Sequence, residues 1–327
     1  MARAVTLEEV GARAGVSRST VSRVINGSPD ASPKAVAAVM EAVTELGYVP
    51  NRSAQALASR KAAVVTALIP EDMERFFGDP FFGAIISGIE DGIRSTSLVL
   101  NLVVTSEASS DKILSFLVGG QSDGILVLSH HTSHRLIEAV ERRIPVVYGG
   151  KPIGNPEEKN YVDVDNCEGG RMAARHLLAK GRRQLAMIAG PSDMPSAQER
   201  RAGFLELAGS AVIEAGDYSA ASGAEAARRL LDAGGPVDGV FVANDLMARA
   251  AVDVFQASGR RVPEDIAVVG FDDSVAATVA RPHLTTIRQD PFAQGQTMVQ
   301  LLLSRLEGNE PARSVLLPLT LVERESA

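Results

Sequence analysis

The sequence predicts an α/β protein in which a small head of three helices precedes a body of two doubly wound parallel sheets. Two short helical segments joined by a glycine turn occupy residues 5–27. From residue 63 onward, runs rich in Val, Ile and Leu alternate with helical stretches, which is typical of parallel strands covered by helices on both faces. The alternation starts again near residue 162 with too many strands for one sheet, so we expect two subdomains.

The first two helices carry their own start and stop signals. Thr6 and Glu9 form a capping-box pattern, and Gly15 ends the first helix because glycine adopts the left-handed backbone at little cost. Ser17 caps the second helix, whose outward side chains are Arg18, Ser19, Ser22 and Arg23. A basic, hydroxylated second helix is typical of the helix-turn-helix motif, which places it in the DNA major groove; an ordinary helical hairpin is the alternative.

A third helix is predicted from Ser32 or Pro33 to Leu46, and Gly47 ends it. Its expected apolar stripe consists of Val36, Val39, Met40, Val43 and Leu46. Residues 53–60 then combine helix propensity with almost no apolar face, and they are fewer than the roughly 12–15 at which an isolated helix becomes marginal. This segment is either a plain linker or one that folds only against a partner.

Charge is distributed unevenly along the chain. The net charge is −7, which argues against a uniformly basic nucleic-acid binder, but the first 61 residues hold eight Lys and Arg against five Asp and Glu. A basic head on an acidic body suits phosphate contact by the head alone. No apolar run reaches the roughly 20 residues of a membrane helix, and the first residues lack the apolar core of a signal peptide, so we expect a cytoplasmic protein without a membrane partner.

Polar side chains follow several strands of the predicted body, and ligands of such sheets bind beyond the carboxyl ends of the strands. Carboxylates, amides and a guanidinium suit a ligand with many hydroxyl groups, because each hydroxyl both donates and accepts. Taken singly, each residue is also explained as a helix cap, as with Asn244 before a helix. The residues expected around one cleft are Asp163, Asp165, the loop 190–193 with Asp193, Arg200, Asn244, Asp245, Asp272, Asp273 and Gln289.

The motifs of several enzyme classes are missing. No G-x-G-x-x-G opens the first strand–helix turn, and neither G-x-x-x-x-G-K-[ST] nor G-x-S-x-G occurs. The only cysteine, Cys167, excludes an internal disulfide and a cysteine-rich zinc site. His130, His131 and His134 follow a strand, where we expect a solvated loop rather than a metal cluster. We therefore predict no catalytic residues, no metal and no cofactor.

Nearly the whole chain resembles the LacI/GalR family of transcription regulators. The most specific match is VTLEEVGARAGVSRSTVSRVING followed by LGYVPNRSAQALA. Further matches are DPFFGAIISGIEDG, VFVANDLMARAA, VPEDIAVVGFDDS and HLTTIRQD. The resemblance implies a DNA-binding domain over residues 1–49, a hinge helix over 50–61, and a periplasmic-binding-protein-like body over 62–327. Within the body it implies a first subdomain of residues 62–161 and 291–322 and a second of 162–290.

The resemblance also implies roles for residues of the head. Arg18, Ser19 and Arg23 stand where the family reads base edges, and arginine suits the N7 and O6 atoms of guanine. Leu57 stands where the family inserts a minor-groove wedge that kinks the operator. The remaining implied DNA contacts are Thr6, Ser17, Ser22, Asn26, Asn51, Ala54 and Ala58.

In the body, the resemblance implies an effector site, with Asp163, Phe76 and Phe77 as weaker candidates beside it. Its implied contacts are Asp79, Phe81, Phe82, Asp165, Arg200, Asn244, Phe271, Asp272 and Gln289. The segment 204–216 is shorter than in the family, which puts one helix of the second subdomain in doubt. Residues 147–152, VYGGKP, and 189–194, AGPSDM, resemble the subgroup that responds to cellobiose and related β-glucosides.

The function implied is a repressor of carbohydrate-utilisation genes that a sugar releases from a palindromic operator. We expect a homodimer rather than a tetramer, because the chain ends without a leucine-heptad tail. Its partners would be double-stranded operator DNA and the sugar. Two alternatives stay open: a corepressor-type regulator of the same family, and a sugar-binding transport component, which the head and the missing signal peptide disfavour.

Overall fold

The computed structural model describes residues 5–25, 30–48, 62–105, 110–131, 135–309 and 313–327. The chain forms two compact units, Met1–Ala62 and Ala63–Ala327, which are described separately below.

The first unit is a three-helix head. Helices α1 (Leu7–Ala14), α2 (Arg18–Ile25) and α3 (Pro33–Leu46) pack around a small core of Val10, Val21, Val24, Val39 and Ala42. The predicted stripe of α3 is partly wrong, because Val36 and Met40 are 39% and 51% exposed. The inward face of α3 is rotated so that Ala42 packs in the core in their place.

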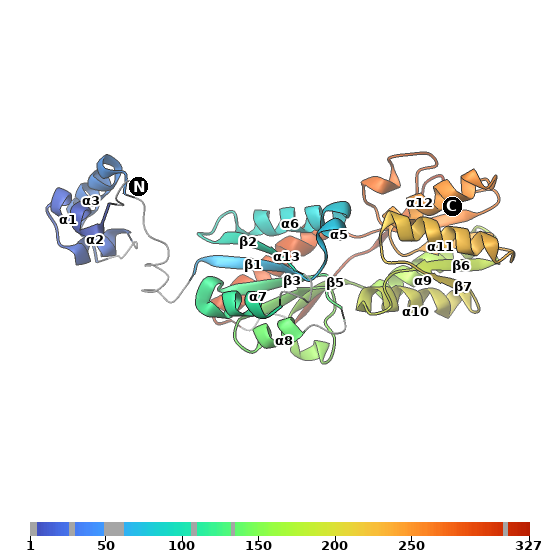
Figure 1. Ribbon diagram of the computed structural model, residues 1–327, viewed down its shortest axis with the longest axis horizontal. Helices are drawn as coiled ribbons and strands as arrows, with labels where there is room; N and C mark the ends of the chain where they lie inside the picture. The colour runs from blue at the N-terminus through green and yellow to red at the C-terminus, as the bar shows by residue number, and fades with distance from the viewer. Residues whose placement is uncertain (1–4, 26–29, 49–61, 106–109, 132–134, 310–312) are drawn as a thin grey trace. The chain divides into compact units, whose positions relative to one another are not determined.

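The first sheet of the body is entirely parallel, and helices cover both of its faces (Figure 1). Its strands, in spatial order, are β11 (Ser314–Leu317), β5 (Tyr161–Val164), β4 (Val146–Gly149), β3 (Gly124–Leu128), β1 (Val64–Ile69) and β2 (Val99–Val104). Alternate residues of β3 point into two cores: Leu126 packs in the core beneath α6 and α13, and Val127 packs in the core beneath α7 and α8. The helices are α5 (Met73–Gly78), α6 (Pro80–Ile93), α7 (Ser110–Phe116), α8 (Arg135–Glu141) and α13 (Pro291–Leu306), with a π-helical turn at Leu117–Gln121 and a 3₁₀ turn at Pro156–Glu158.

The second sheet is parallel except for one edge strand. Its order is β12 (Thr320–Val322), β10 (Thr285–Arg288), β9 (Ala267–Asp272), β8 (Gly239–Val242), β6 (Leu185–Ala189) and β7 (Val212–Ala215), and β12 pairs with β10 in the antiparallel sense. Helices α9 (Asn166–Ala179) and α10 (Pro195–Ala208) pack together below this sheet in Figure 1, and α11 (Ala220–Asp232) and α12 (Asp245–Ala257) pack together above it. A 3₁₀ turn at Val275–Ala277 follows β9.

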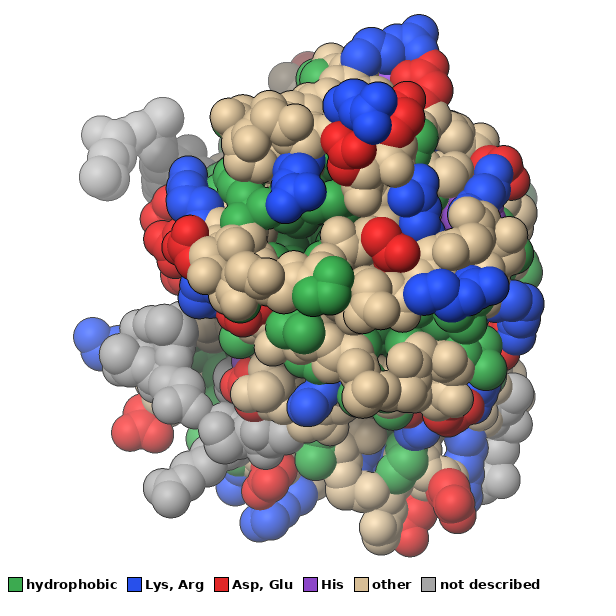
Figure 2. All heavy atoms as spheres, turned by 90° about the vertical axis from the view of Figure 1, so that its right-hand side faces the viewer, with side chains coloured by type: hydrophobic (Ala, Val, Ile, Leu, Met, Phe, Trp, Pro, Cys, Tyr) green, Lys and Arg blue, Asp and Glu red, His purple; other side chains and the backbone are tan. Residues whose placement is uncertain are grey.

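The shortened segment 204–216 leaves the neighbouring elements intact, since α10 runs to Ala208 and β7 begins at Val212. Lys/Arg and Asp/Glu side chains are mixed over the face of the molecule that Figure 2 shows. Among the helices that the structure places, none is long and apolar enough to cross a membrane.

The chain passes between the two sheets at three places, and two of them differ from the sequence prediction. Residues 162–164 belong to β5 of the first sheet, so the crossing follows Val164 rather than residue 161. Residues 320–322 belong to the second sheet, although we expected 291–322 in the first subdomain. The physical reason is that Leu319 and Leu321 pack against the core of the second sheet. The remaining crossing lies between β10 and α13 and contains Gln289.

Candidate functional site

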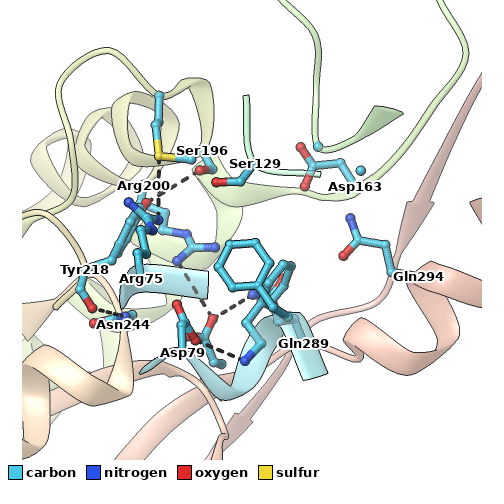
Figure 3. Close-up of a pocket in the computed structure, with 16 residues that line it drawn as sticks. Arg75, Asp79, Ser129, Asp163, Ser196, Arg200, Tyr218, Asn244, Gln289 and Gln294 are labelled. Atoms are coloured by element: carbon cyan, nitrogen blue, oxygen red, sulfur yellow. Dashed lines mark hydrogen bonds and ion pairs between the residues drawn. The ribbon is translucent and has the colours of Figure 1, made fainter. Parts of the chain in front are cut away.

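A pocket lies in the body where loops from both sheets meet, and its empty space amounts to about 580 Å³ when the part that is open solvent is included (Figure 3). Its lining includes eight of the residues predicted around the cleft: Asp79, Phe81, Phe82, Asp163, Arg200, Asn244, Asp272 and Gln289. It also includes Arg75, Ser129, Gly149, Gly150, Met194, Ser196, Tyr218 and Gln294. The first sheet and its helices supply one wall, and the second sheet with helix α10 and the adjoining loops supplies the other.

Two predicted contacts, Asp165 and Phe271, do not line the pocket. Asp165 caps α9 by accepting a hydrogen bond from the backbone N–H of Glu168 at 2.8 Å. Phe271 is fully buried, and its ring supports the guanidinium of Arg200 from behind. Of the weaker candidates, Asp163 lines the pocket, whereas Phe76 packs on Phe82 and Phe77 is 76% exposed, and neither phenylalanine is part of the lining.

Arg200 is the central cation of the pocket. Its Nε donates to Asn166 Oδ1 at 2.9 Å, and its Nη1 donates to the carbonyl oxygen of Ala243 at 2.6 Å. The same Nη1 lies 4.0 Å from Asp272 Oδ1. Because hydrogen bonds and a ring hold this guanidinium, it is pre-oriented for a ligand before one arrives.

Close packing of α9 on α10 positions Arg200. A Cβ on Gly203 would lie 1.8 Å from the carbonyl oxygen of Cys167, and a Cβ on Gly170 would lie 2.1 Å from the carbonyl oxygen of Arg200 itself. Neither distance is possible for a larger residue without moving one helix. The two glycines therefore let the helices approach until Arg200 reaches both Asn166 and Ala243.

Asp272 and Gln289 form a second polar group. Gln289 Nε2 donates to Asp272 Oδ1 at 2.6 Å. Burial raises the pKa of Asp272 well above its usual range, and the Arg200 guanidinium opposes this shift. The backbone of Asp272 adopts φ = +109°, a region that non-glycine residues seldom occupy. The fold thus holds a strained backbone and a poorly solvated carboxyl group at the pocket wall.

Two residues that cap helices also line the pocket. Asn244 Oδ1 accepts from the backbone N–H of Met247 at 3.0 Å, while its Nδ2 donates to the carbonyl oxygen of Tyr218 at 2.9 Å. Asp79 accepts from the backbone N–H of Phe81 at 3.0 Å, and burial raises its pKa. The capping and ligand-contact interpretations of such residues are therefore compatible, since a cap fixes the side chain at the cleft edge.

The carboxylate of Asp163 is occupied mainly by hydrogen bonds from other groups of the protein. It accepts from the backbone N–H groups of Val164 and Lys151, each at 2.7 Å, and from Asn166 Nδ2 at 3.1 Å. Burial raises its pKa to about 6. These bonds tie β5 to the loop after β4 and to the start of α9, at one of the crossings between the sheets.

The prediction missed Arg75 and Tyr218. Arg75 Nη1 donates to the carbonyl oxygen of Asp217 at 3.2 Å, and its guanidinium lies over the Tyr218 ring at 5.1 Å from the ring centre. Tyr218 follows β7, a strand of four residues in the shortened segment whose sequence does not show the apolar run typical of a buried strand. The ring occupies space that Gly190 leaves open, because a Cβ there would lie 2.3 Å from its Cζ.

The arrangement suits a neutral ligand with several hydroxyl groups. Carboxylates accept from hydroxyls, the amides of Asn244 and Gln289 both donate and accept, and Phe81, Phe82 and Tyr218 supply apolar surface for C–H faces. Burial raises the pKa of Asp79 and of Asp272, and a ligand hydroxyl would offer these carboxyl groups hydrogen bonds that solvent does not supply.

In the head, Arg18, Ser19 and Arg23 are exposed on α2, and Ser22 is half-buried. Thr6 and Glu9 form the predicted capping box, and Ser17 Oγ accepts from the backbone N–H of Thr20 at 3.2 Å. Arg18 Nε lies 3.1 Å from Glu8 Oε1 in an exposed ion pair. The other predicted DNA contacts, Asn26, Asn51, Ala54, Leu57 and Ala58, and the hinge helix 50–61 lie outside the described residues.

The histidines after β3 are part of a polar network rather than a solvated loop. His130 is buried, and its Nε2 lies 2.8 Å from the carbonyl oxygen of Lys151. His131 lies between Glu71 and Asp193. His134 is outside the described residues. Within the part of the chain that is described, no group of His, Cys, Asp and Glu has the arrangement of a metal site.

Comparison with known proteins agrees with this combination of head and cleft. Residues 6–51 match the model of bacterial regulatory proteins of the lacI family, and residues 174–327 match a periplasmic binding protein-like domain. The chain belongs to the lacI family. It is a DNA-binding transcription regulator and not an enzyme.

Individual relatives extend the match over nearly the full length. The transcriptional regulator CelR of Thermobifida fusca is 43% identical over 96% of both chains. A solved CelR–cellobiose complex is 40% identical, with a TM-score of 0.79 and coverage of 99% of this chain and 100% of that one. The lac repressor dimer bound to operator and an anti-inducer is 30% identical, with a TM-score of 0.87 over 99% of each chain.

Proposed function

We propose that the protein is a cytoplasmic repressor of carbohydrate-utilisation genes that cellobiose or another β-glucoside releases from a palindromic operator. The observation that carries this proposal is the cleft around Arg200, Asn244 and Asp272, with its hydroxyl-binding chemistry, in the same chain as a helix-turn-helix head. The similarity to CelR and to its cellobiose complex favours a β-linked disaccharide over other sugars.

In the head, Arg18, Ser19 and Arg23 read base edges from α2, while Thr6, Ser17, Ser22 and Asn26 contact phosphates. The exposure of both arginines supports this assignment. Arg18 exchanges its ion pair with Glu8 for DNA, at little cost because exposed pairs contribute little stability. The hinge residues Asn51, Ala54, Leu57 and Ala58 contact the operator centre in a homodimer.

In the body, Arg200 and Asp272 bind neighbouring hydroxyls of the sugar, and Asn244, Gln289 and Asp79 bind others. Arginine's fork matches paired oxygen atoms, and the carboxylate accepts from the same hydroxyls. Tyr218 and the two phenylalanines of α6 cover the faces of the sugar rings. Asp165 and Phe271 act indirectly, the first by starting α9 and the second by supporting Arg200.

The sugar acts by drawing the two subdomains together. The resulting shift separates the two hinge segments of the dimer, and the operator is released. Because this is a coupling free energy between two sites, operator DNA must weaken sugar binding by the same factor.

The test is a binding assay on the full-length chain with DNA from upstream of its own gene. Fluorescence anisotropy measures operator affinity with no sugar and with saturating cellobiose, cellotriose, lactose, maltose or glucose. A loss of operator affinity with cellobiose alone or with cello-oligosaccharides supports the proposal. A gain of affinity makes the protein a corepressor-type regulator, and an unchanged affinity with every sugar overturns the effector assignment.

A further inference from the structure

Polar contacts join the two subdomains of the body along the rim of the cleft, outside the ligand pocket. His131, after β3 of the first sheet, meets Asp193, after β6 of the second, with 2.8 Å between Nδ1 and Oδ2. Lys151, after β4, meets Glu199 of α10, with 2.7 Å between Nζ and Oε1. None of these four residues belongs to the pocket lining. Both contacts can exist only while the two lobes are close together.

The surroundings of His131 require a particular protonation state. Its Nδ1 faces Asp193, and its Nε2 lies 3.2 Å from Oε1 of Glu71, so each ring nitrogen faces a carboxylate oxygen. A neutral imidazole has one N–H and one lone pair, and it donates to only one of the two. The imidazolium donates to both. The ring therefore donates to Glu71 and Asp193 at the same time only when His131 carries a proton, and the charge of that proton strengthens the contact across the cleft.

We propose that His131 and Asp193 form a proton-dependent clasp that holds the two subdomains together, so that mild acidification favours the closed cleft and strengthens sugar binding. Opening the cleft removes Asp193 from His131, while Glu71 stays, because it belongs to the same subdomain as His131. The closed form thus has one more carboxylate beside the ring than the open form. The effect on sugar binding rests on the proposed function. The proton-dependent closure of the two subdomains does not depend on it.

The direction of the pH effect follows from the pKa of the ring. Hydrogen bonds to Glu71 and Asp193 raise the pKa of His131, although partial burial opposes the shift. A group that binds its proton more tightly in the closed form stabilises that form below its pKa in the open form. This stabilisation is lost as the pH rises through the higher pKa of the closed form. Closure should therefore weaken between mildly acidic and mildly alkaline pH.

Other charged groups pack near the clasp. Glu71 also accepts from Ser129 Oγ at 2.5 Å, and its Oε1 lies 3.5 Å from Arg75 Nε. Arg75 reaches the second subdomain through the carbonyl oxygen of Asp217. Within the pocket, Asp79, Asp163 and Asp272 have raised pKa values and titrate in their own right. A pH dependence of cleft closure in the wild type alone would not show that His131 causes it. Variants of the clasp residues are therefore needed to identify the responsible group.

The experiment measures lobe separation in the full-length chain without sugar. Dyes on Lys112→Cys and Arg201→Cys, two exposed positions on different lobes, report Förster transfer in a Cys167→Ser background between pH 6 and pH 8.5. We expect transfer to be higher at pH 6, and we expect this change to be much smaller in His131→Gln and in Asp193→Asn, where only the pocket carboxyl groups still contribute to it. Asp193 is half exposed, so the second variant keeps the test valid if the first does not fold.

Two matched variants complete the design. His283→Gln removes a histidine of the second subdomain outside the clasp and should leave the pH response unchanged. Lys151→Gln removes the rim contact that does not titrate in this range, and it should lower transfer at both pH values by a similar amount. An equal pH response in His131→Gln and the wild type would overturn the clasp, as would loss of the response in Lys151→Gln.

Calorimetric titration with cellobiose then tests the link to sugar binding. We expect the wild type to bind more tightly at pH 6 than at pH 8.5, by about threefold or more, because the closed form holds the proton of His131 more tightly than the open form. His131→Gln should lose this part of the pH dependence and keep that of the pocket carboxyl groups. If cellobiose does not bind at all, the effector proposal fails, while the transfer measurement still decides the clasp.

Discussion

The guanidinium of Arg200 lies over the ring of Phe271, with 3.5 Å between Cζ and the ring centre. The two residues are far apart in sequence, and both were predicted to contact a ligand, but only Arg200 lines the pocket. Phe271 instead occupies the space behind the guanidinium, so it fixes the plane in which Arg200 offers its N–H groups. The geometry of the site therefore depends on a buried ring that no ligand needs to touch.

This relationship predicts that Arg200→Lys is not a conservative change. An ammonium cannot bond Asn166 and Ala243 at once while lying over the ring, so we expect at least a roughly tenfold loss of cellobiose affinity, as the loss of a charge-assisted contact implies. The operator affinity of the sugar-free protein should be retained. Calorimetry and anisotropy measure the two quantities, and Arg201→Lys, at the exposed neighbouring position, serves as the control. Equal sugar affinities for the two variants would remove Arg200 from the site.

Because α9 and α10 pack closely, we expect that adding a single methyl group at Gly203 destabilises the protein strongly. Gly203→Ala places a Cβ against the carbonyl oxygen of Cys167, so the helices must separate, at a cost of about 1–3 kcal/mol. Gly235→Ala, at an open position of the same subdomain, should cost much less. Thermal unfolding of both variants checks the difference. If Gly203→Ala melts like Gly235→Ala, the close helix contact is not present in solution.

Asp245 predicts a pH dependence of stability. Its buried carboxylate accepts from Thr286 Oγ1 at 2.7 Å and from the backbone N–H of Ser274 at 2.8 Å, and burial raises its pKa to about 7. Since the folded pKa exceeds the unfolded value near 4, the native state loses stability as the pH rises between these values, by up to about 1.4 kcal/mol per pH unit. Asp245→Asn removes this titration and retains both hydrogen-bond positions.

We therefore expect the melting temperature of Asp245→Asn, relative to the wild type, to increase from pH 5 to about pH 7 and then to level off towards pH 8. Asp265→Asn is the matched control, because the hydrogen bond from Arg261 lowers the pKa of Asp265 to about 2, below the range of the experiment. Its melting curve should run parallel to that of the wild type. Parallel behaviour of Asp245→Asn would mean that Asp245 is already ionised throughout this range.

In the head, we expect Arg23 to determine which DNA sequence is bound and Arg13 to have little influence on that choice. Arg23→Ala should weaken operator binding by about 1–3 kcal/mol and reduce the ratio of operator to random-DNA affinity, because a base contact is lost. Arg13→Ala, which removes an exposed arginine of α1 paired with Glu45, should leave this ratio nearly unchanged. Anisotropy with both DNAs measures the ratio. An unchanged ratio for Arg23→Ala would assign that residue to the phosphate backbone.

Part of the predicted core was wrong because apolar spacing along a helix does not by itself determine which face of the helix is buried. In α3 the apolar spacing includes Val36 and Met40, yet the head is too small to cover them, and Ala42 fills the core instead. The ends of strands were more informative, since Asn244 and Asp272 follow β8 and end β9 at the expected edge. Tyr218 was missed because β7 is only four residues long and half exposed.

The amino-acid order alone determined the three-helix head, the two-sheet body and most of the polar residues of the cleft, because helix caps, strand ends and turn glycines are local features. Tertiary structure decided which loops of the two sheets face each other. It placed Arg75 against Tyr218, Phe271 behind Arg200, and His131 between Glu71 and Asp193. These contacts join residues from different lobes or distant elements, and they depend on helix approach distances and on where the chain crosses between the sheets, which no local pattern encodes.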